Sequence, residues 1–106
     1  MYDVAIIGGG PGGYASALYA HNFGLSVVLV EKADVGGTCL HRGCIPAKSW
    51  IHTAEVFAEV AEAATFGVVT SPPQVDWSRA LARKQAVVSQ LHKGLLGLLK
   101  QRKVEI

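Results

Sequence analysis

Two cysteines and a glycine-rich loop are the parts of this 106-residue chain whose residue types and spacing could do chemistry. Cys39 and Cys44 are its only cysteines, and both lie in the segment GGTCLHRGCIPAK at 36–48. The loop at 8–13 reads GGGPGG, which is typical of a dinucleotide-binding turn. A dithiol that follows a dinucleotide site along the chain suggests electron transfer.

The glycine loop satisfies the pattern G-x-G-x-x-G through Gly8, Gly10 and Gly13. The first glycine permits the tight turn off a strand, the second lets the backbone approach a pyrophosphate, and the third lets the helix pack closely on the sheet. The pyrophosphate then lies at the helix N-terminus, whose N–H groups and dipole favour anions. Glu31 ends the next apolar run, where its carboxylate can accept hydrogen bonds from ribose hydroxyls and would repel a 2′-phosphate.

The spacing of the cysteines constrains their geometry. On an ideal α-helix the Cα atoms of Cys39 and Cys44 would lie about 8 to 9 Å apart, whereas a disulfide requires less than about 7 Å. A bridge therefore requires a distorted helix start, which Gly43 and Pro46 make possible. Cys44 would begin the following helix with Lys48 one turn on, and both the helix dipole and the ammonium favour a thiolate. A plain structural staple, or two buried free thiols, is the alternative.

A flavin is the dinucleotide that suits a neighbouring dithiol. A thiolate cannot deliver a hydride to nicotinamide, whereas a flavin can accept an electron pair from it, so FAD bound through its ADP half at 8–13 is the expected cofactor. Zinc is a weaker interpretation, because no second cysteine or histidine pair has ligand spacing. We therefore expect no metal site.

The elements that must position these residues begin with a βαβ unit. Residues 2–7 form a β-type run, 14–22 form an alanine-rich helix that Gly24 ends, and 26–30 form a second β-type run. This order predicts an α/β fold with a parallel sheet and a Rossmann-like dinucleotide-binding unit.

Two helices are predicted after that unit. The first runs from about 39 to 65 and has an apolar stripe that includes Val56 and Phe57. The second begins after Asp76, its N-cap, and ends near 100. Residues at helical spacing mark it: Trp77, Leu81, Lys84, Val88, Leu91, Leu95 and Leu98. Residues 104–106 look like the start of a strand, and because parallel sheets are usually covered and have about five strands, we expect the N-terminal part of a larger protein.

Composition excludes several classes of partner. The formal net charge is +2, and the basic group at Lys100, Arg102 and Lys103 is mixed with Glu105, which indicates a solvated helix end rather than a nucleic-acid patch. The longest apolar runs are far shorter than the roughly 20 residues that cross a bilayer. We expect no nucleic acid and no membrane contact. Because the first β-type run begins at Tyr2, we expect no signal peptide and favour a reducing, cytoplasmic compartment.

With these features in place, the chain resembles the pyridine nucleotide-disulfide oxidoreductases over all 106 residues, and most closely those that oxidise dihydrolipoamide. Its most specific part is 36–48, supported by 8–13 and Glu31. The resemblance implies an FAD-dependent enzyme whose catalytic residues, Cys39 and Cys44, cycle between disulfide and dithiol. It implies that Cys39 exchanges with the sulfur of the substrate and that Cys44 forms the charge-transfer contact with the flavin.

The resemblance also implies contacts around the cofactor. Lys48 matches a lysine near the flavin ring, Gly37 and Thr38 match residues around the FAD phosphates, and Glu31 matches the acid that binds the adenosine ribose. The candidate cofactor-binding residues are Gly8, Gly10, Pro11, Gly12, Gly13, Glu31, Lys32, Gly37, Thr38, Cys44 and Lys48.

Some features depart from the family pattern. His41 and Arg42 stand where Asn-Val is frequent, and Ala47 stands where serine is frequent. The NAD domain and the interface domain, which supplies the catalytic histidine from a partner subunit, have no counterpart in these residues, so we expect the 106 residues alone to be inactive. The histidines at 21, 41, 52 and 92 are expected to lie on the surface or in helix packing, with His41 close enough to perturb a thiolate.

The leading hypothesis is therefore the FAD-binding, redox-disulfide portion of an enzyme that oxidises dihydrolipoamide on a lipoyl-bearing protein and passes the electrons to NAD. A homodimer is expected for the complete enzyme. The ending at 45–48 favours lipoamide, but glutathione, mercuric ion or another disulfide remains an alternative substrate. A non-catalytic nucleotide-binding module is the alternative from a different class.

Overall fold

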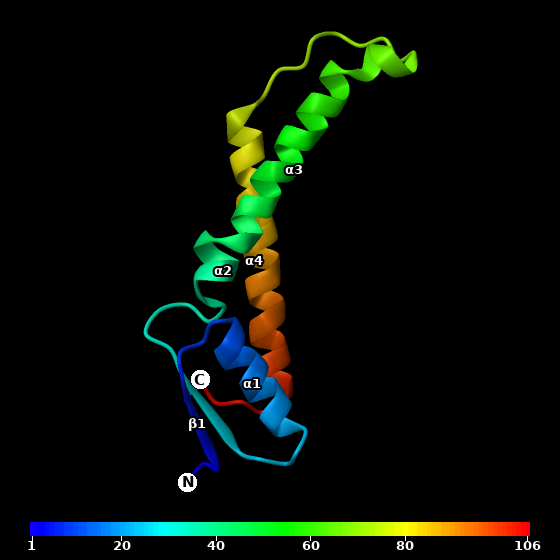
Figure 1. Ribbon diagram of the computed structural model, residues 1–106. Coiled ribbons are helices and arrows are strands. Elements are labelled where there is room, and N and C mark those ends of the chain that lie inside the picture. The colour runs from blue at the N-terminus through cyan, green and yellow to red at the C-terminus, as the bar shows by residue number, and fades with distance from the viewer.

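The computed structural model describes all 106 residues as a small α/β body from which two helices extend (Figure 1). In chain order the elements are strand β1 Val4–Ile7, helix α1 Pro11–His21, strand β2 Val27–Val30, helix α2 Gly37–Arg42, helix α3 Cys44–Ala61, the 3₁₀ turn η1 Ala63–Phe66 and helix α4 Trp77–Gln101. The predicted βαβ unit is confirmed, and the long helix predicted near the C-terminus is present as α4.

The sheet is parallel, as predicted. β1 and β2 pair in register from Val4 with Val27 to Ile7 with Val30, and α1 crosses between them. The chain returns to the sheet after α4, where the N–H of Leu29 donates to the carbonyl of Glu105 (2.7 Å). The strand expected at 104–106 is therefore present as a parallel bridge beside β2.

The core lies between the sheet, α1 and the C-terminal end of α4. Its buried hydrophobic residues are Ala17, Val27, Leu29, Val35, Leu99 and Val104. Leu29 and Leu99 are fully buried, whereas Leu98, which the helical spacing had marked, is 39% exposed. Spacing alone left the contact face of α4 uncertain by one residue, because a long helix can be rotated slightly without changing its apolar pattern.

α3 and α4 pack side by side in opposite directions and extend away from the sheet (Figure 1). They give the molecule extents of 64 × 24 × 18 Å. The predicted apolar stripe of α3 is only partly covered, since Val56 and Phe57 are 46% and 40% exposed. The predicted N-cap of α4 is confirmed, because the Asp76 carboxylate accepts a hydrogen bond from the N–H of Arg79 (3.0 Å).

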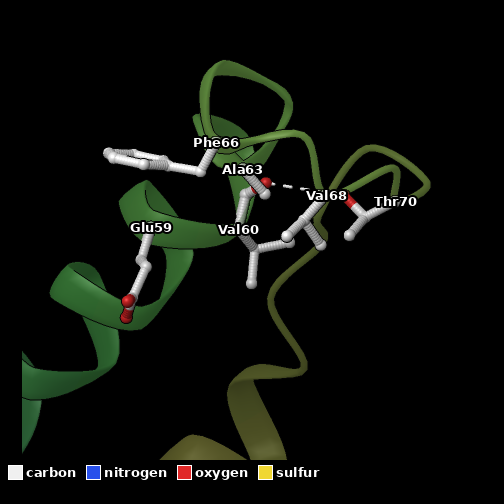
Figure 2. A pocket seen from close by; sticks show the side chains of 6 residues that line it. All are labelled: Glu59, Val60, Ala63, Phe66, Val68 and Thr70. Atoms are coloured by element: carbon white, nitrogen blue, oxygen red, sulfur yellow. Dashed lines mark hydrogen bonds between the residues drawn. The ribbon is translucent and has the colours of Figure 1, made fainter.

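A cavity of about 370 Å³ lies at the end of the α3–α4 pair that is farther from the sheet (Figure 2). Its lining residues are Glu59, Val60, Ala63, Phe66, Val68 and Thr70. None of the predicted site residues lies there. The helix predicted from about 39 to 65 is interrupted twice, first at Gly43 and then at Glu62, where the 3₁₀ turn begins. No helix is long and apolar enough to span a membrane.

Candidate active site

The glycine loop forms the tight turn between β1 and α1. Gly8 has a φ of +101°, a conformation that residues with a Cβ rarely adopt. Its N–H donates to the carbonyl of Val30 at 2.8 Å, which holds the turn against the end of β2. A Cβ on Gly13 would lie 1.7 Å from the carbonyl oxygen of Gly8. The helix therefore approaches the strand as closely as it does because both positions are glycine.

The N-terminus of α1 is open toward the loop. Pro11 is its first residue, and Gly10, the N-cap, offers no side chain to cap it. No acidic residue lies in the first turn. The first N–H groups and the positive end of the helix dipole can therefore receive an anion such as a pyrophosphate.

Glu31 is held at the end of β2 by two backbone groups. Its Oε2 accepts from the N–H of Gly9 (2.7 Å) and its Oε1 from the N–H of Ala33 (3.0 Å). These two hydrogen bonds, the one from Gly9 first, lower the pKa of Glu31 below its ordinary value. The ionised carboxylate keeps further lone pairs that can accept hydrogen bonds from hydroxyl groups.

A polar cavity of about 400 Å³ lies beside this carboxylate. Its lining residues are Glu31, Lys32, Ala33, Asp34, Gly37, Thr38, His41 and Arg42. It gathers four of the predicted cofactor-binding residues, but neither the glycine loop nor Cys44 nor Lys48 lines it. The sequence did not predict that Asp34, His41 or Arg42 would line this cavity. Their closeness in the chain to the predicted cofactor-binding residues was the only indication.

The start of α2 is in direct contact with the glycine loop. The N–H of Gly36 donates to the carbonyl of Gly9 at 2.7 Å. A Cβ on Gly37 would lie 2.6 Å from the Cα of Gly10, and the φ of Gly37 is +67°. The backbone thus connects the dinucleotide turn to the helix that contains Cys39, which follows Gly37 by less than one turn.

The two cysteines lie at the junction of two helices. Cys39 is in α2 and Cys44 is the first residue of α3, with Gly43 between the helices. A Cβ on Gly43 would lie 3.1 Å from the carbonyl oxygen of Thr38 and 3.4 Å from the Cα of Cys39, so the glycine permits a close backbone approach. The expected distortion takes the form of a complete break. Pro46 is buried in the first turn of α3, where its missing N–H is not needed.

Both cysteines are free thiols. Cys39 is half-buried and Cys44 is exposed. The hydrogen bond of its side chain with Cys44 raises the pKa of Cys39, and burial raises it further. The ammonium of Lys48 acts in the opposite direction and lowers the pKa of Cys39. Cys39 is therefore a thiol that retains its proton to higher pH than an ordinary cysteine does.

An apolar cavity explains the burial of Cys39. It has a volume of about 270 Å³ and is lined by Tyr14, Cys39, Leu40, Ile45, Leu91 and Leu95. Residues of four helices form this wall, and Cys39 on it is half-buried whereas Cys44 is exposed.

His41 lines the polar cavity and contacts His92 of α4. His41 donates from Nε2 to the carbonyl of Val35 (2.9 Å), since a carbonyl can only accept, and its ring packs edge-to-face on His92 at 4.7 Å. Cys44 and Lys48 are the neighbours that shift the pKa of Cys39, and the expectation that His41 perturbs the pair stays a prediction. No group of three or more His, Cys, Asp or Glu side chains could hold a metal ion.

Comparisons with known proteins agree with this geometry. Residues 2–106 match the family described as pyridine nucleotide-disulphide oxidoreductase. The chain is 46% identical over 105 residues to a dihydrolipoyl dehydrogenase of Bacillus subtilis, with 99% of this chain and 22% of that protein covered. It is 47% identical over 106 residues to one of Acholeplasma laidlawii, with 99% and 32% covered. It is 41% identical over 105 residues to one of Zymomonas mobilis, with 99% and 22% covered. The chain thus spans between about a fifth and a third of these relatives.

Proposed function

Since the chain belongs to the pyridine nucleotide-disulphide oxidoreductase family, we propose that its 106 residues form the N-terminal part of the FAD-binding domain of a dihydrolipoyl dehydrogenase. The complete enzyme oxidises dihydrolipoamide on a lipoyl-bearing protein, with NAD as the final acceptor, and acts as a homodimer. We place it in a reducing, cytoplasmic compartment, where a close cysteine pair is more often catalytic than a structural staple.

The residues present fit the ADP half of FAD. The uncapped N-terminus of α1 can receive a pyrophosphate, the loop has no Cβ at Gly8, Gly10 or Gly13 to obstruct it, and the ionised Glu31 can accept ribose hydroxyls. The residues proposed to hold the cofactor are Gly8, Gly10, Pro11, Gly12, Gly13, Glu31, Lys32, Gly37, Thr38, Cys44 and Lys48. When bound, FAD would supply a two-electron acceptor beside the dithiol.

The observation that carries the proposal is the break at Gly43. It gives a close backbone approach between the two helices, with a Cβ on Gly43 only 3.4 Å from the Cα of Cys39, although on a continuous helix Cys39 and Cys44 would be too far apart to bridge. The same α2 that holds Cys39 begins against the glycine loop at Gly10. The proposed redox pair and the proposed dinucleotide turn are therefore joined by direct backbone contact.

The pair acts by thiol–disulfide exchange. One thiol of dihydrolipoamide attacks the sulfur of Cys39, the Cys39–Cys44 bond breaks, and Cys44 leaves as a thiolate near the ammonium of Lys48. The second substrate thiol then closes the disulfide of lipoamide and releases the sulfur of Cys39, which takes up one of the two substrate protons because its pKa is raised. Two electrons pass to the pair, and the remaining proton leaves to a base outside these residues.

The test uses the protein purified at the length in which the cell makes it. We expect bound FAD and NAD reduction that depends on dihydrolipoamide. Cys39→Ser and Cys44→Ser should each reduce turnover by about 10³-fold or more, because neither variant can form the disulfide. Ser71→Ala, in an exposed loop, should leave turnover unchanged. Unaltered lipoamide turnover in Cys39→Ser would refute the exchange role. Activity with only glutathione disulfide or mercuric ion would assign the alternative substrate.

A further inference from the structure

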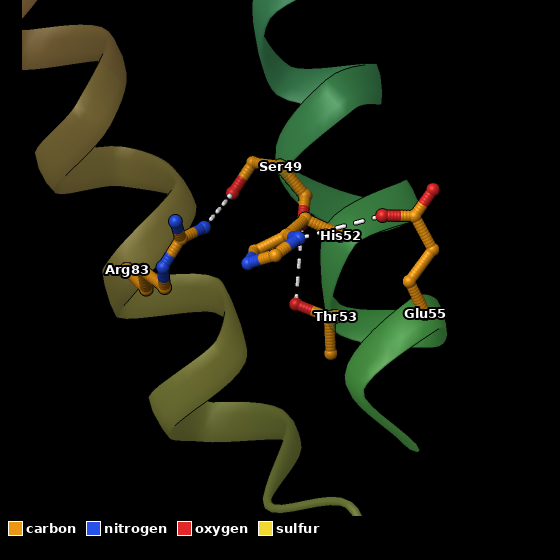
Figure 3. A network of polar contacts seen from close by, with 5 residues as sticks. All are labelled: Ser49, His52, Thr53, Glu55 and Arg83. Atoms are coloured by element: carbon orange, nitrogen blue, oxygen red, sulfur yellow. Dashed lines mark hydrogen bonds and ion pairs between the residues drawn. The ribbon is translucent and has the colours of Figure 1, made fainter. Parts of the chain in front are cut away.

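Helix α4 contacts both helices that contain the cysteines (Figure 1). Against α2, the ring of His92 packs on the ring of His41 with centroids 4.7 Å apart and planes at 81°. Against α3, a guanidinium nitrogen of Arg83 donates a hydrogen bond of 2.9 Å to the hydroxyl of Ser49 (Figure 3). One long helix therefore contacts each side of the junction where the redox pair lies.

The hydrogen bond between Arg83 and Ser49 joins α3 to α4 at a buried position. Ser49 is the one buried polar residue of the chain, 6% exposed, and it directly follows Lys48. The Ser49 hydroxyl accepts a hydrogen bond from the Arg83 guanidinium, and the Ser49 carbonyl accepts one from the hydroxyl of Thr53 (3.2 Å). The Arg83–Ser49 bond is the only side-chain hydrogen bond that joins α3 to α4. A charged donor makes such a bond stronger than a neutral one.

The geometry of the junction makes these contacts consequential. Gly43 alone separates α2 from α3, so the angle between the two helices sets the distance between the sulfurs of Cys39 and Cys44. A glycine has no side chain to fix that angle. Whatever holds both helices on a third element therefore holds the two sulfurs together.

We propose that α4 is a clamp for the redox pair, in which Arg83 and His92 are positioning residues that fix the separation of Cys39 and Cys44. The proposal deepens the function proposed above, since it rests on the redox role of the pair. Loosening either contact lets α2 and α3 diverge and lowers the effective concentration of one sulfur at the other. The disulfide then becomes harder to close and easier to reduce, because a disulfide tolerates only a narrow range of Cα and Cβ separations.

The test measures the equilibrium between the dithiol and the disulfide in glutathione buffers, using the purified protein. The S–S bond of oxidised glutathione breaks, the Cys39–Cys44 bond forms, and the two thiol hydrogens end on two molecules of reduced glutathione. Alkylation followed by peptide mass spectrometry reads the oxidised fraction of this pair. For Arg83→Met and for His92→Ala we expect an equilibrium constant for disulfide formation about tenfold lower, or about 30 mV in reduction potential.

Matched variants separate positioning from general destabilisation. Arg83→Lys keeps a charged donor and should restore the constant to within about twofold of the unaltered protein. Arg79→Met removes a charge from the exposed start of α4 and should leave the constant unchanged. Ser49→Ala should lower the equilibrium constant for disulfide formation as much as Arg83→Met does. The variant that carries both substitutions should lower it no further, because each removes the same hydrogen bond.

The clamp is wrong if folded Arg83→Met and Ser49→Ala each keep the constant within about twofold, or if Arg79→Met lowers it equally. Circular dichroism establishes folding, and Ser49→Ala decides the matter if Arg83→Met does not fold. The assay needs neither flavin nor lipoamide. A protein that shows the expected shifts without lipoamide turnover would retain the clamp and lose the proposed substrate.

Discussion

Replacing Gly13 by alanine would push the first turn of α1 away from β1. The added Cβ would lie 1.7 Å from the carbonyl oxygen of Gly8, and Cβ contacts below 3.0 Å essentially do not occur. The oxygen and the helix must therefore separate by about 1.3 Å at least, which follows from those two distances. The obstructing atom belongs to the backbone, so no change of rotamer relieves it. We expect a cost at the upper end of the overpacking range, about 3 kcal/mol of unfolding free energy.

Urea denaturation of the purified protein tests this value, and Gly12→Ala is the matched control. A Cβ on Gly12 meets no atom within 4 Å, so this variant should be neutral or gain up to about 1 kcal/mol through the unfolded chain. Gly13→Ala should lower the midpoint by about 1 to 2 M urea without a change in slope. Equal midpoints for the two variants would refute the close-approach reasoning.

Three further perturbations follow from the same structure. Gly43→Ala places a Cβ 3.1 Å from the carbonyl oxygen of Thr38, so we expect α2 and α3 to separate and disulfide formation in glutathione buffers to weaken several-fold; an unchanged oxidised fraction would contradict this. Backbone N–H groups hold the pKa of Glu31 below its ordinary 4.5, so its ionised form stabilises the fold above that pH and the contribution is lost as the pH falls through the folded pKa. The difference in urea midpoint between the unaltered protein and Glu31→Gln should be constant above about pH 5.5 and shrink below pH 4.5, whereas a difference that grows on acidification would reverse the sign. Asp76→Ala removes the N-cap bond to Arg79 and should cost about 1 kcal/mol in thermal unfolding, a result that an unchanged midpoint would exclude.

Local signals account for the parts of the fold that could be predicted from the sequence. The glycine loop, the apolar run before Glu31 and the N-cap Asp76 each act within a few residues, so the elements that they delimit were predicted with bounds close to those observed. A distorted helix start near Gly43 was predictable if the cysteines bridge, because two cysteines five positions apart on a continuous helix cannot form a disulfide, but the complete break into two helices was not predicted.

Contacts between distant segments could not be predicted in the same way. Periodicity identified an apolar stripe on α3, but it could not show that Phe57 would remain 40% exposed, since that depends on what lies opposite. Arg42 lines the polar cavity because of the orientation of α2, which no local sequence pattern specifies. Arg83 and Ser49 meet across 34 positions of the chain, and neither residue type carries a signal for the other.

Reductive titration of the purified protein, with thiols and flavin absorbance read together, tests the central claim most directly. The claim is that Cys39 and Cys44 form a redox disulfide beside FAD. The account predicts that the first two electrons open this bond, making both cysteines available for alkylation while most flavin absorbance is retained, and that in Cys44→Ser the same two electrons bleach the flavin. Bleaching by the first two electrons in the unaltered protein, with no new thiols at Cys39 and Cys44, would contradict it.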